Sequence, residues 1–262
     1  MKTTMHMPVL AYHLVTDKVD LGFARTSMKQ FQRQMAWLQE NEYQTLTLQE
    51  AANFNYAKSQ NSSQKYVVLT FDDAYASIQH AAEIMSDYGF VGTCFAISDY
   101  IGKLNNWDYQ FYARKWLHAD AHLLKSLVQA GWEVGSHSRR HHFLGRLSKI
   151  KLSEDLAVSR DRISELTGKL VKTISYPFGY ADQRVCKIAR HCGYQYGVGL
   201  GLPFQKQIKL GKMCMPRLGV YLFDTLYSFQ SKIQAFNKTS TWHFALQQII
   251  SFGSRATVLL KS

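Results

Sequence analysis

The chain has 262 residues, of which 46% are hydrophobic and 13% aromatic, a composition that excludes a disordered protein and suits one large α/β domain. The formal net charge of +12 favours anionic partners. No apolar run approaches the ~20 residues that a membrane-spanning helix needs, and the residues before Pro8 hold no apolar signal segment.

Strand and helix signals alternate along the chain. The first predicted elements are a strand near Val9, a helix opened by the capping pattern of Ser27, a strand at 43–46 and a short helix opened by Thr47. The first helix should bury Phe31, Met35 and Leu38 on one face. The following elements are strand 66–71, helix 78–88, strand 93–97, helix 120–130, strand 132–136, helix 153–167, strand 173–176 and helix 182–192.

Repeated strand-then-helix order predicts a parallel α/β sheet. An open doubly wound sheet and a barrel both satisfy this order. Candidate functional residues follow at least four of the predicted strands, and they can converge only if the sheet curls into a closed or nearly closed barrel. These residues are His13, Asp72, Asp73, His137, His141 and Phe178.

Asp72 and Asp73 come directly after strand 66–71, so their carboxylates should project from its carboxyl end. His137 and His141 follow strand 132–136 in the same way. Either pair alone could be structural, as a solvated strand end or as buried histidines. Together they offer one carboxylate and two imidazoles, a set that leaves a metal coordination position open. The second carboxylate is then free to act as a base, which indicates metal-assisted hydrolysis.

The same residues resemble the motifs of a known family. Thr70–Ala74, His137–His141 and Tyr176–Gly179 are similar to the first three motifs of the NodB-homology polysaccharide deacetylases, carbohydrate esterase family four. The opening Pro8–His13 resembles the start of the circularly permuted branch, which includes poly-N-acetylglucosamine deacetylases. The resemblance runs from about Pro8 to Val220, and it implies a distorted, incomplete (β/α) barrel.

The resemblance also implies residue roles. Asp73, His137 and His141 would hold a divalent metal, zinc first and cobalt, nickel or manganese as alternatives. Asp72 would be the general base that takes a proton from metal-bound water. His13 would be the general acid that protonates the leaving amine.

The backbone N–H of Phe178 would stabilise the oxyanion. Substrate contacts are expected from Tyr176 and Pro177 of the third motif and from the basic residues Arg140 and Arg146.

Two departures from the family pattern stand out. Ser175 occupies the place where family members usually carry an arginine that orients the base. The fourth motif, Asp-x-x-Asp-Trp, is absent. Arg217 follows another predicted strand and is a candidate for orienting Asp72, with an ordinary surface arginine as the alternative.

We expect a deacetylase domain at 1–220 and a helical extension at 221–262. The extension carries two apolar stripes, which would pack on the barrel or, as an alternative, lie in a membrane interface. Their members are Leu222, Phe223, Leu226, Phe229, Ile233, Trp242, Leu246, Ile249 and Ile250. Four cysteines without a C-x-x-C pair are expected to be reduced core thiols.

Positive charge is unevenly placed. No acid lies between Val134 and Ser153, an interval that contains Arg139, Arg140, Arg146, Lys149 and Lys151. From Leu202 onward the chain has eight basic residues and a single acidic residue, Asp224. A basic rim would attract a phosphate-bearing glycan or anionic lipid head groups. No nucleic-acid module is visible, so nucleic acid is not expected.

The leading hypothesis is a metal-dependent N-deacetylase of N-acetylhexosamine units in a glycan. Its substrate could be a lipid-carrier-linked or phosphorylated intermediate of cell-surface polysaccharide synthesis. The alternative is a catalytically weak or inactive carbohydrate-binding relative. We expect a cytoplasmic protein with peripheral contact at the inner face of the membrane, and the sequence does not indicate an oligomeric state.

Overall fold

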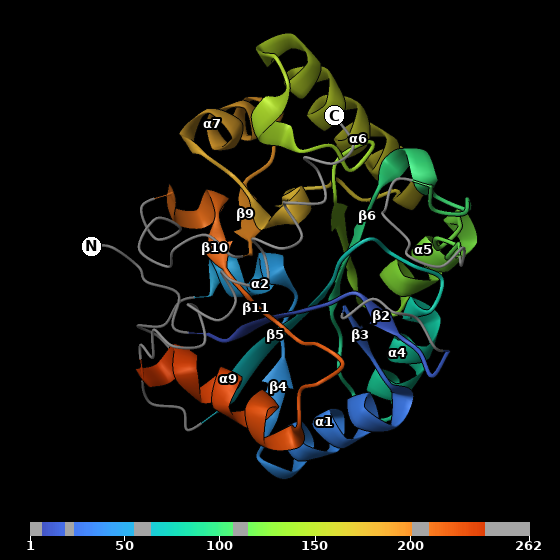
Figure 1. Cartoon of the computed structure of the whole chain (residues 1–262), viewed down its shortest axis with the longest axis vertical. Coiled ribbons are helices and arrows are strands. Elements are labelled where there is room, and N and C mark those ends of the chain that lie inside the picture. Colours follow the sequence, from blue (N-terminus) through green and yellow to red (C-terminus); the bar gives the residue numbers. More distant parts are fainter. Residues whose placement is uncertain (1–6, 19–23, 55–63, 107–114, 201–209, 239–262) are drawn as a thin grey trace.

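The computed structural model describes residues 7–18, 24–54, 64–106, 115–200 and 210–238. Parallel strands form the centre, and helices surround them (Figure 1). The strands are β1 (Val9–Tyr12), β2 (Leu14–Val15), β3 (Arg25–Thr26), β4 (Tyr43–Thr45), β5 (Lys65–Phe71), β6 (Thr93–Ala96), β7 (Glu133–Ser136), β8 (Thr173–Ser175), β9 (Tyr196–Gly199), β10 (Met215–Pro216) and β11 (Leu218–Gly219).

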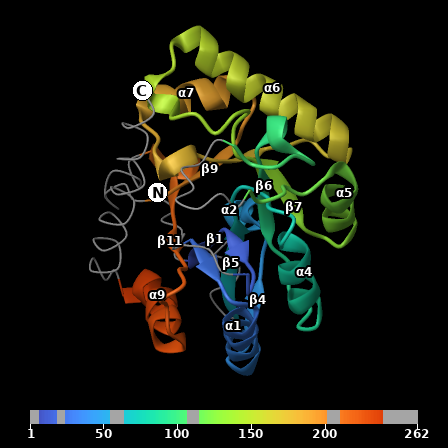
Figure 2. The same ribbon diagram turned by 45° about the vertical axis from the view of Figure 1, so that its right-hand side comes forward.

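The α-helices are α1 (Met28–Glu40), α2 (Leu48–Asn53), α4 (Ile78–Ser86), α5 (Ala121–Gln129), α6 (Lys149–Thr167), α7 (Gln183–His191) and α9 (Leu226–Lys238). Short 3-10 turns are η1 (Ser98–Tyr100), η2 (Leu144–Arg146), η3 (Pro177–Gly179) and η4 (Gly211–Met213). In the view of Figure 2, α6 and α7 lie at the top of the molecule, and α1, α4 and α9 lie at the bottom.

The sheet is nearly closed. Its strand order is β10-β9-β8-β7-β6-β5-β1-β11, with β4 pairing with β5. Only Arg217 separates β10 from β11, so this one segment pairs with β9 on one side and with β1 on the other. The two ends of the sheet therefore meet, and the expected incomplete (β/α) barrel is confirmed. The relation by circular permutation stays a prediction.

Strand residues alternate between the barrel interior and the layer beneath the helices. In β5, Val67, Leu69 and Phe71 belong to the outer core with the helices, whereas Val68 belongs to the inner cluster. Inside the barrel Gly135 leaves no room for a side chain, because an added Cβ would lie 2.6 Å from the Phe95 ring. The inner cluster also includes Leu48 of α2, so this helix closes one end of the barrel.

The helix starts follow local capping signals. Ser27 accepts a hydrogen bond from the backbone of Gln30, and Thr47 with Glu50 forms a complete capping box. The predicted buried face of α1 is confirmed. The helix α6 begins at Lys149, four residues before the expected start, because Ser148 caps it. Its first turn alternates basic and apolar residues, which hides the helical periodicity.

The C-terminal extension differs from the expected stripe. The helix α9 begins at Leu226, and Leu222 and Phe223 precede it and are exposed. Phe229 is buried, with its ring 6.1 Å from Trp37 of α1. The second stripe, from Trp242 to Ile250, lies outside the described residues, and the domain boundary stays a prediction.

All four cysteines are buried and free, as expected. Among the helices of the described ranges, none combines the length and the apolar character that crossing a bilayer requires.

Candidate metal centre and active site

The alternation of the strands points a ring of polar residues into the mouth of the barrel. Thr70 is on the inward face with Val68, and Asp72 continues that face beyond the strand. The register pairs Tyr12 with Phe71, so His13 and Asp72 are neighbours one step further along. Arg217 has the same inward parity as Met215. Because all these strands run parallel, their carboxyl ends share one rim, where the candidate residues gather.

Asp73 reaches this rim through an unusual backbone. A continued strand would turn its side chain outward, but its φ of 67° is left-handed. Apart from Glu42, the non-glycine residues with positive φ in the described ranges all lie at this site. They are Asp73, Ala74, Ser138, His141 and Phe178. Such strain is typical of sites where the backbone is bent for function.

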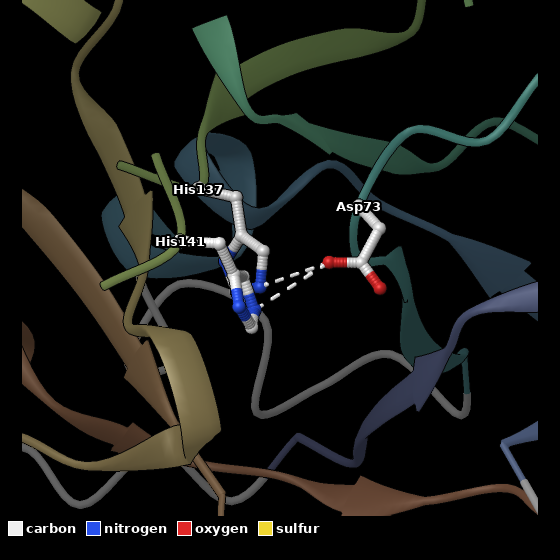
Figure 3. Close-up of side chains that lie close together, drawn as sticks. All are labelled: Asp73, His137 and His141. Carbon is white, nitrogen blue, oxygen red and sulfur yellow. Dashed lines mark ion pairs between the residues drawn. The ribbon is translucent and has the colours of Figure 1, made fainter. Parts of the chain in front are cut away.

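The predicted ligands converge. Asp73 Oδ1 lies 3.4 Å from His137 Nε2 and 3.6 Å from His141 Nε2 (Figure 3). One ligand atom from each of the three residues lies within 4.8 Å of the others. Ligands about 2.0–2.1 Å from a tetrahedral zinc ion are separated by roughly 3.3 Å. The donor set and its spacing therefore fit a divalent metal of this kind.

Hydrogen bonds prepare the ligands. His137 Nδ1 donates to the backbone carbonyl of Ser175 at 2.7 Å, which leaves the Nε2 lone pair for a metal. The hydroxyl of Ser138 accepts from the backbone N–H of His141 at 3.0 Å and closes the turn between the two histidines. Burial lowers the pKa of His137 to about 4 and the pKa of His141 well below its usual range. Both rings are therefore neutral near pH 7, as metal ligands must be.

Asp72 is held by Arg217 inside the barrel. Arg217 donates from Nη1 to Asp72 Oδ1 and from Nη2 to Asp72 Oδ2, both at 2.8 Å. The same guanidinium donates to Thr70 Oγ1 at 2.9 Å and to Ser175 Oγ at 2.8 Å. Burial alone would raise the pKa of Asp72, but the charge and hydrogen bonds of Arg217 outweigh burial and hold the pKa well below its usual range.

The arginine is thus not a surface residue, since it is only 1% exposed. Its guanidinium is hydrogen-bonded to Ser175, which occupies the position where the resembled family carries its arginine. Arg217 therefore brings a guanidinium to that position from another strand. Its role in orienting the base stays a prediction.

Replacing Arg217 by Met is expected to invert the pH dependence of stability. In the wild type the folded pKa of Asp72 lies below the unfolded value, so this pair stabilises the fold above pH ~4 and its contribution is lost as the pH falls through the folded pKa. Without the guanidinium, Asp72 is a buried unpaired charge, which typically costs about 3–5 kcal/mol. Its folded pKa then rises above the unfolded value, and the metal-free variant should melt at a higher temperature at pH 5 than at pH 8.

The control is the double variant Arg217→Met, Asp72→Asn, which removes the stranded charge. Because neither position then titrates, this site should contribute no difference between the melting temperatures at pH 5 and pH 8. An Arg217→Met protein with the wild-type pH dependence would show that the pair does not set the pKa of Asp72.

His13 follows β1 at the same rim and is partly buried. Its Nδ1 is buried without a hydrogen-bond partner among the described residues. Burial lowers the pKa of His13, while the charge of Asp72 raises it and that of Arg217 lowers it further. The imidazole therefore lies close enough to Asp72 and Arg217 for their charges to act on it, and its role as the general acid stays a prediction.

Phe178 sits in η3 with a left-handed φ of 57°. Its ring centroid is 4.7 Å from that of His141, so the segment that carries the predicted oxyanion donor adjoins the ligand set. Gly179 follows with φ 64°, and an added Cβ there would lie 1.9 Å from the carbonyl oxygen of Leu200. Only glycine fits this position.

The predicted substrate contact of Tyr176 requires correction. Its alternation with Ser175 turns the side chain away from the barrel interior, into the outer core, where it is fully buried. Pro177 is also buried. The Tyr176 ring packs against Gly197, whose added Cβ would lie 2.8 Å from it, so this residue supports the site from beneath rather than facing a substrate.

The basic rim is also more neutral than the sequence suggests. Asp99 of η1 accepts from Arg139 at 3.1 Å and from Arg140 and Arg162 at 2.9 Å. Glu154 also pairs with Arg139. Two residues of the expected basic rim, Arg139 and Arg140, are thus paired with acids that the fold brings from distant segments. The other members of the cluster, Arg146, Lys149 and Lys151, are exposed.

Sequence reasoning missed His118. Its Nδ1 donates to the backbone carbonyl of Asp73 at 2.7 Å, and burial lowers its pKa to about 4. No local pattern marks it, since it lies between predicted elements. The sequence shows it only as a histidine two residues before Asp120, the capping residue of α5.

The fold thus brings three carboxylate and imidazole side chains that could hold a metal ion to the mouth of a (β/α) barrel. Comparison with known proteins agrees. The family model described as polysaccharide deacetylase matches residues 59–197, more than half of the chain. The chain therefore belongs to the polysaccharide deacetylase family, the NodB-homology group.

Among its relatives, YxkH of Bacillus subtilis (strain 168), which is named as a polysaccharide deacetylase, is 31% identical over 193 residues, covering 73% of this chain and 63% of that protein. The poly-beta-1,6-N-acetyl-D-glucosamine N-deacetylase of Staphylococcus aureus (strain MRSA252) is 28% identical, covering 66% of this chain and 60% of its own length. The chain thus spans less than two thirds of these relatives. The structure of IcaB from Ammonifex degensii has the same fold, with a TM-score of 0.72, 21% identity and coverage of 87% of this chain and 97% of that chain.

Proposed function

We propose that this chain is a metal-dependent N-deacetylase that removes acetyl groups from N-acetylhexosamine units of a glycan. One observation carries the proposal. The ligand set Asp73, His137 and His141 lies at the same barrel mouth as Asp72, a carboxylate that Arg217 keeps ionised although it is buried. The similarity to the staphylococcal poly-beta-1,6-N-acetyl-D-glucosamine N-deacetylase supports an acetylated amino sugar as substrate.

The residues divide the chemistry between them. Asp73, His137 and His141 would hold the metal, with zinc as the first choice for a set of two imidazoles and one carboxylate. The chemistry that a divalent cation supplies in such a site is polarisation of a carbonyl and a lowered pKa of water. Asp72 accepts the proton of the water that attacks the amide carbon. A carboxylate has about four lone-pair sites, so Asp72 can do so while both its oxygens accept from Arg217.

Breaking the carbon–nitrogen bond requires a proton on the leaving amine. His13 is beside Asp72 in the strand register and donates this proton, giving acetate and a free amino sugar. Because its pKa is lowered, His13 is largely neutral before the reaction. The proton that it donates is therefore the one that Asp72 took from water, so both residues return to their starting states. The backbone N–H of Phe178 donates to the developing oxyanion, an interaction typically worth ~3–4 kcal/mol.

The direct test measures metal content and acetate release together. The purified protein should hold one divalent metal per chain and release acetate from N-acetylglucosamine oligomers, and a chelator should stop the release. A protein that binds the oligomers but releases no acetate with any of zinc, cobalt, nickel or manganese would instead be a carbohydrate-binding relative.

We further propose that the substrate is anionic, as a phosphorylated or lipid-carrier-linked glycan at an anionic membrane surface would be. The exposed residues Arg146, Lys149 and Lys151 follow the metal-binding loop and support this. The location at the inner face of the membrane stays a prediction.

Added salt should lower kcat/KM for a phosphorylated glycan but leave a neutral oligosaccharide almost unaffected, because exposed charges are screened beyond ~8 Å at physiological ionic strength. Charge reversal with Arg146→Glu and Lys149→Glu should weaken only the first reaction. Equal reversal of Lys169 and Lys172, which precede β8, provides a control with the same change in net charge. Salt-independent turnover of both substrates would make the charge a general surface property.

A further inference from the structure

The backbone of the metal-binding aspartate is held in a conformation that residues with a side chain rarely adopt. Asp73 has φ 67° and the next residue, Ala74, has φ 48°. Two successive left-handed residues persist only where surrounding contacts over-determine them. The contacts that hold this turn therefore decide where the Asp73 carboxylate points.

A segment before α5 supplies those contacts. Tyr75 and His118 form an antiparallel bridge. The backbone N–H of Ala119 donates to the Ala74 carbonyl at 2.7 Å, and the N–H of Ala76 donates to the Leu117 carbonyl at 2.8 Å. These backbone bonds fix the residues after Asp73, and any amino acid at position 118 could preserve them.

The carbonyl of Asp73 itself is held by a side chain. His118 Nδ1 donates to it at 2.7 Å. Fixing this carbonyl fixes the peptide plane between Asp73 and Ala74, and with it the backbone rotation that aims the carboxylate. The imidazole is itself immobilised, since it is 2% exposed and stacks on Tyr75 with ring centroids 4.8 Å apart. Tyr100 lies against the same imidazole at 5.5 Å.

We propose that His118 is a positioning residue that aims the Asp73 carboxylate and thereby sets the affinity of the metal site. The proposal rests on the metal site of the proposed function. His118 contributes no atom to the group formed by Asp73, His137 and His141. Its hydrogen bond goes to the backbone carbonyl of a ligand residue. Hydrogen-bond partners of metal ligands typically change metal affinity by about 10–100-fold.

The test separates the hydrogen bond from the packing of the ring. His118→Asn places an amide donor where Nδ1 lies, His118→Gln carries the same amide one methylene too far, and His118→Phe keeps a ring without a donor. Metal-free proteins are titrated with Co²⁺ against a competing chelator, and their melting temperatures are recorded before metal is added. His122→Phe, on the exposed side of α5, is the matched control.

His118→Phe and His118→Gln should bind Co²⁺ roughly 10–100-fold more weakly than the wild type. His118→Asn should stay closer to the wild type, and His122→Phe should equal it. If His118→Phe fails to fold, the comparison of Asn with Gln decides. The proposal would be overturned if Co²⁺ affinity simply followed the melting temperatures of the metal-free variants and His118→Phe bound Co²⁺ as tightly as the wild type. His118 would then act through packing. A wild type that binds no Co²⁺ would overturn the metal site and this inference together.

Discussion

His137→Ala is expected to abolish both stoichiometric metal binding and turnover. The variant loses one of the three predicted ligands, an imidazole whose Nε2 lies 3.4 Å from Asp73 Oδ1. It also loses the hydrogen bond that His137 Nδ1 gives to the Ser175 carbonyl. Activity should fall by more than the ~10²–10⁴-fold that loss of a single acid or base group costs. Metal per chain, measured by elemental analysis after dialysis, and acetate release are the two readouts.

The neighbouring residue provides the control for this change. The side chain of His142 is 52% exposed, and its Nδ1 lies 4.0 Å from Asp155 Oδ2. His142→Ala should therefore keep its metal and its activity. Full metal occupancy in the double variant His137→Ala, His141→Ala would contradict the ligand assignment, whatever the effect on turnover.

Local patterns predicted much of this site because strands impose alternation. Once 66–71 is a strand of a parallel barrel, its inward face continues to Asp72, and the carboxyl ends of neighbouring strands share one rim. His137 and His141 were recognisable by their spacing after a strand. Capping residues such as Thr47 and Glu50 marked helix starts for equally local reasons.

The missing parts depend on contacts between distant segments. Arg217 meets Asp72 across 145 positions of sequence, and only closure of the barrel through β10 and β11 brings them together. Asp99 neutralises Arg140 from 41 positions away. The outward direction of Tyr176 follows from the strand register, which a motif does not report. The left-handed turn at Asp73 depends on the segment of His118, and propensity alone would have disfavoured it.

Asp72→Asn is expected to keep the metal and lose turnover by ~10²–10⁴-fold, because an amide cannot accept a proton from water. Asp72 is not in the ligand group, so metal content should remain near one per chain.

In the Asn variant the amide nitrogen would face a donor of Arg217, since Arg217 donates to both carboxylate oxygens. Asp72→Ala is therefore measured together with Asp72→Asn. Both variants should show the same loss of kcat, whereas Asp87→Asn, on the exposed end of α4, should show none. His13→Ala should also retain metal, and its pH–rate profile should lose the limb that belongs to the acid, while the Asp72 variants lose the limb that belongs to the base. Turnover of both Asp72 variants within about twofold of the wild type would contradict the assignment, since that is far below the usual effect of removing a general base.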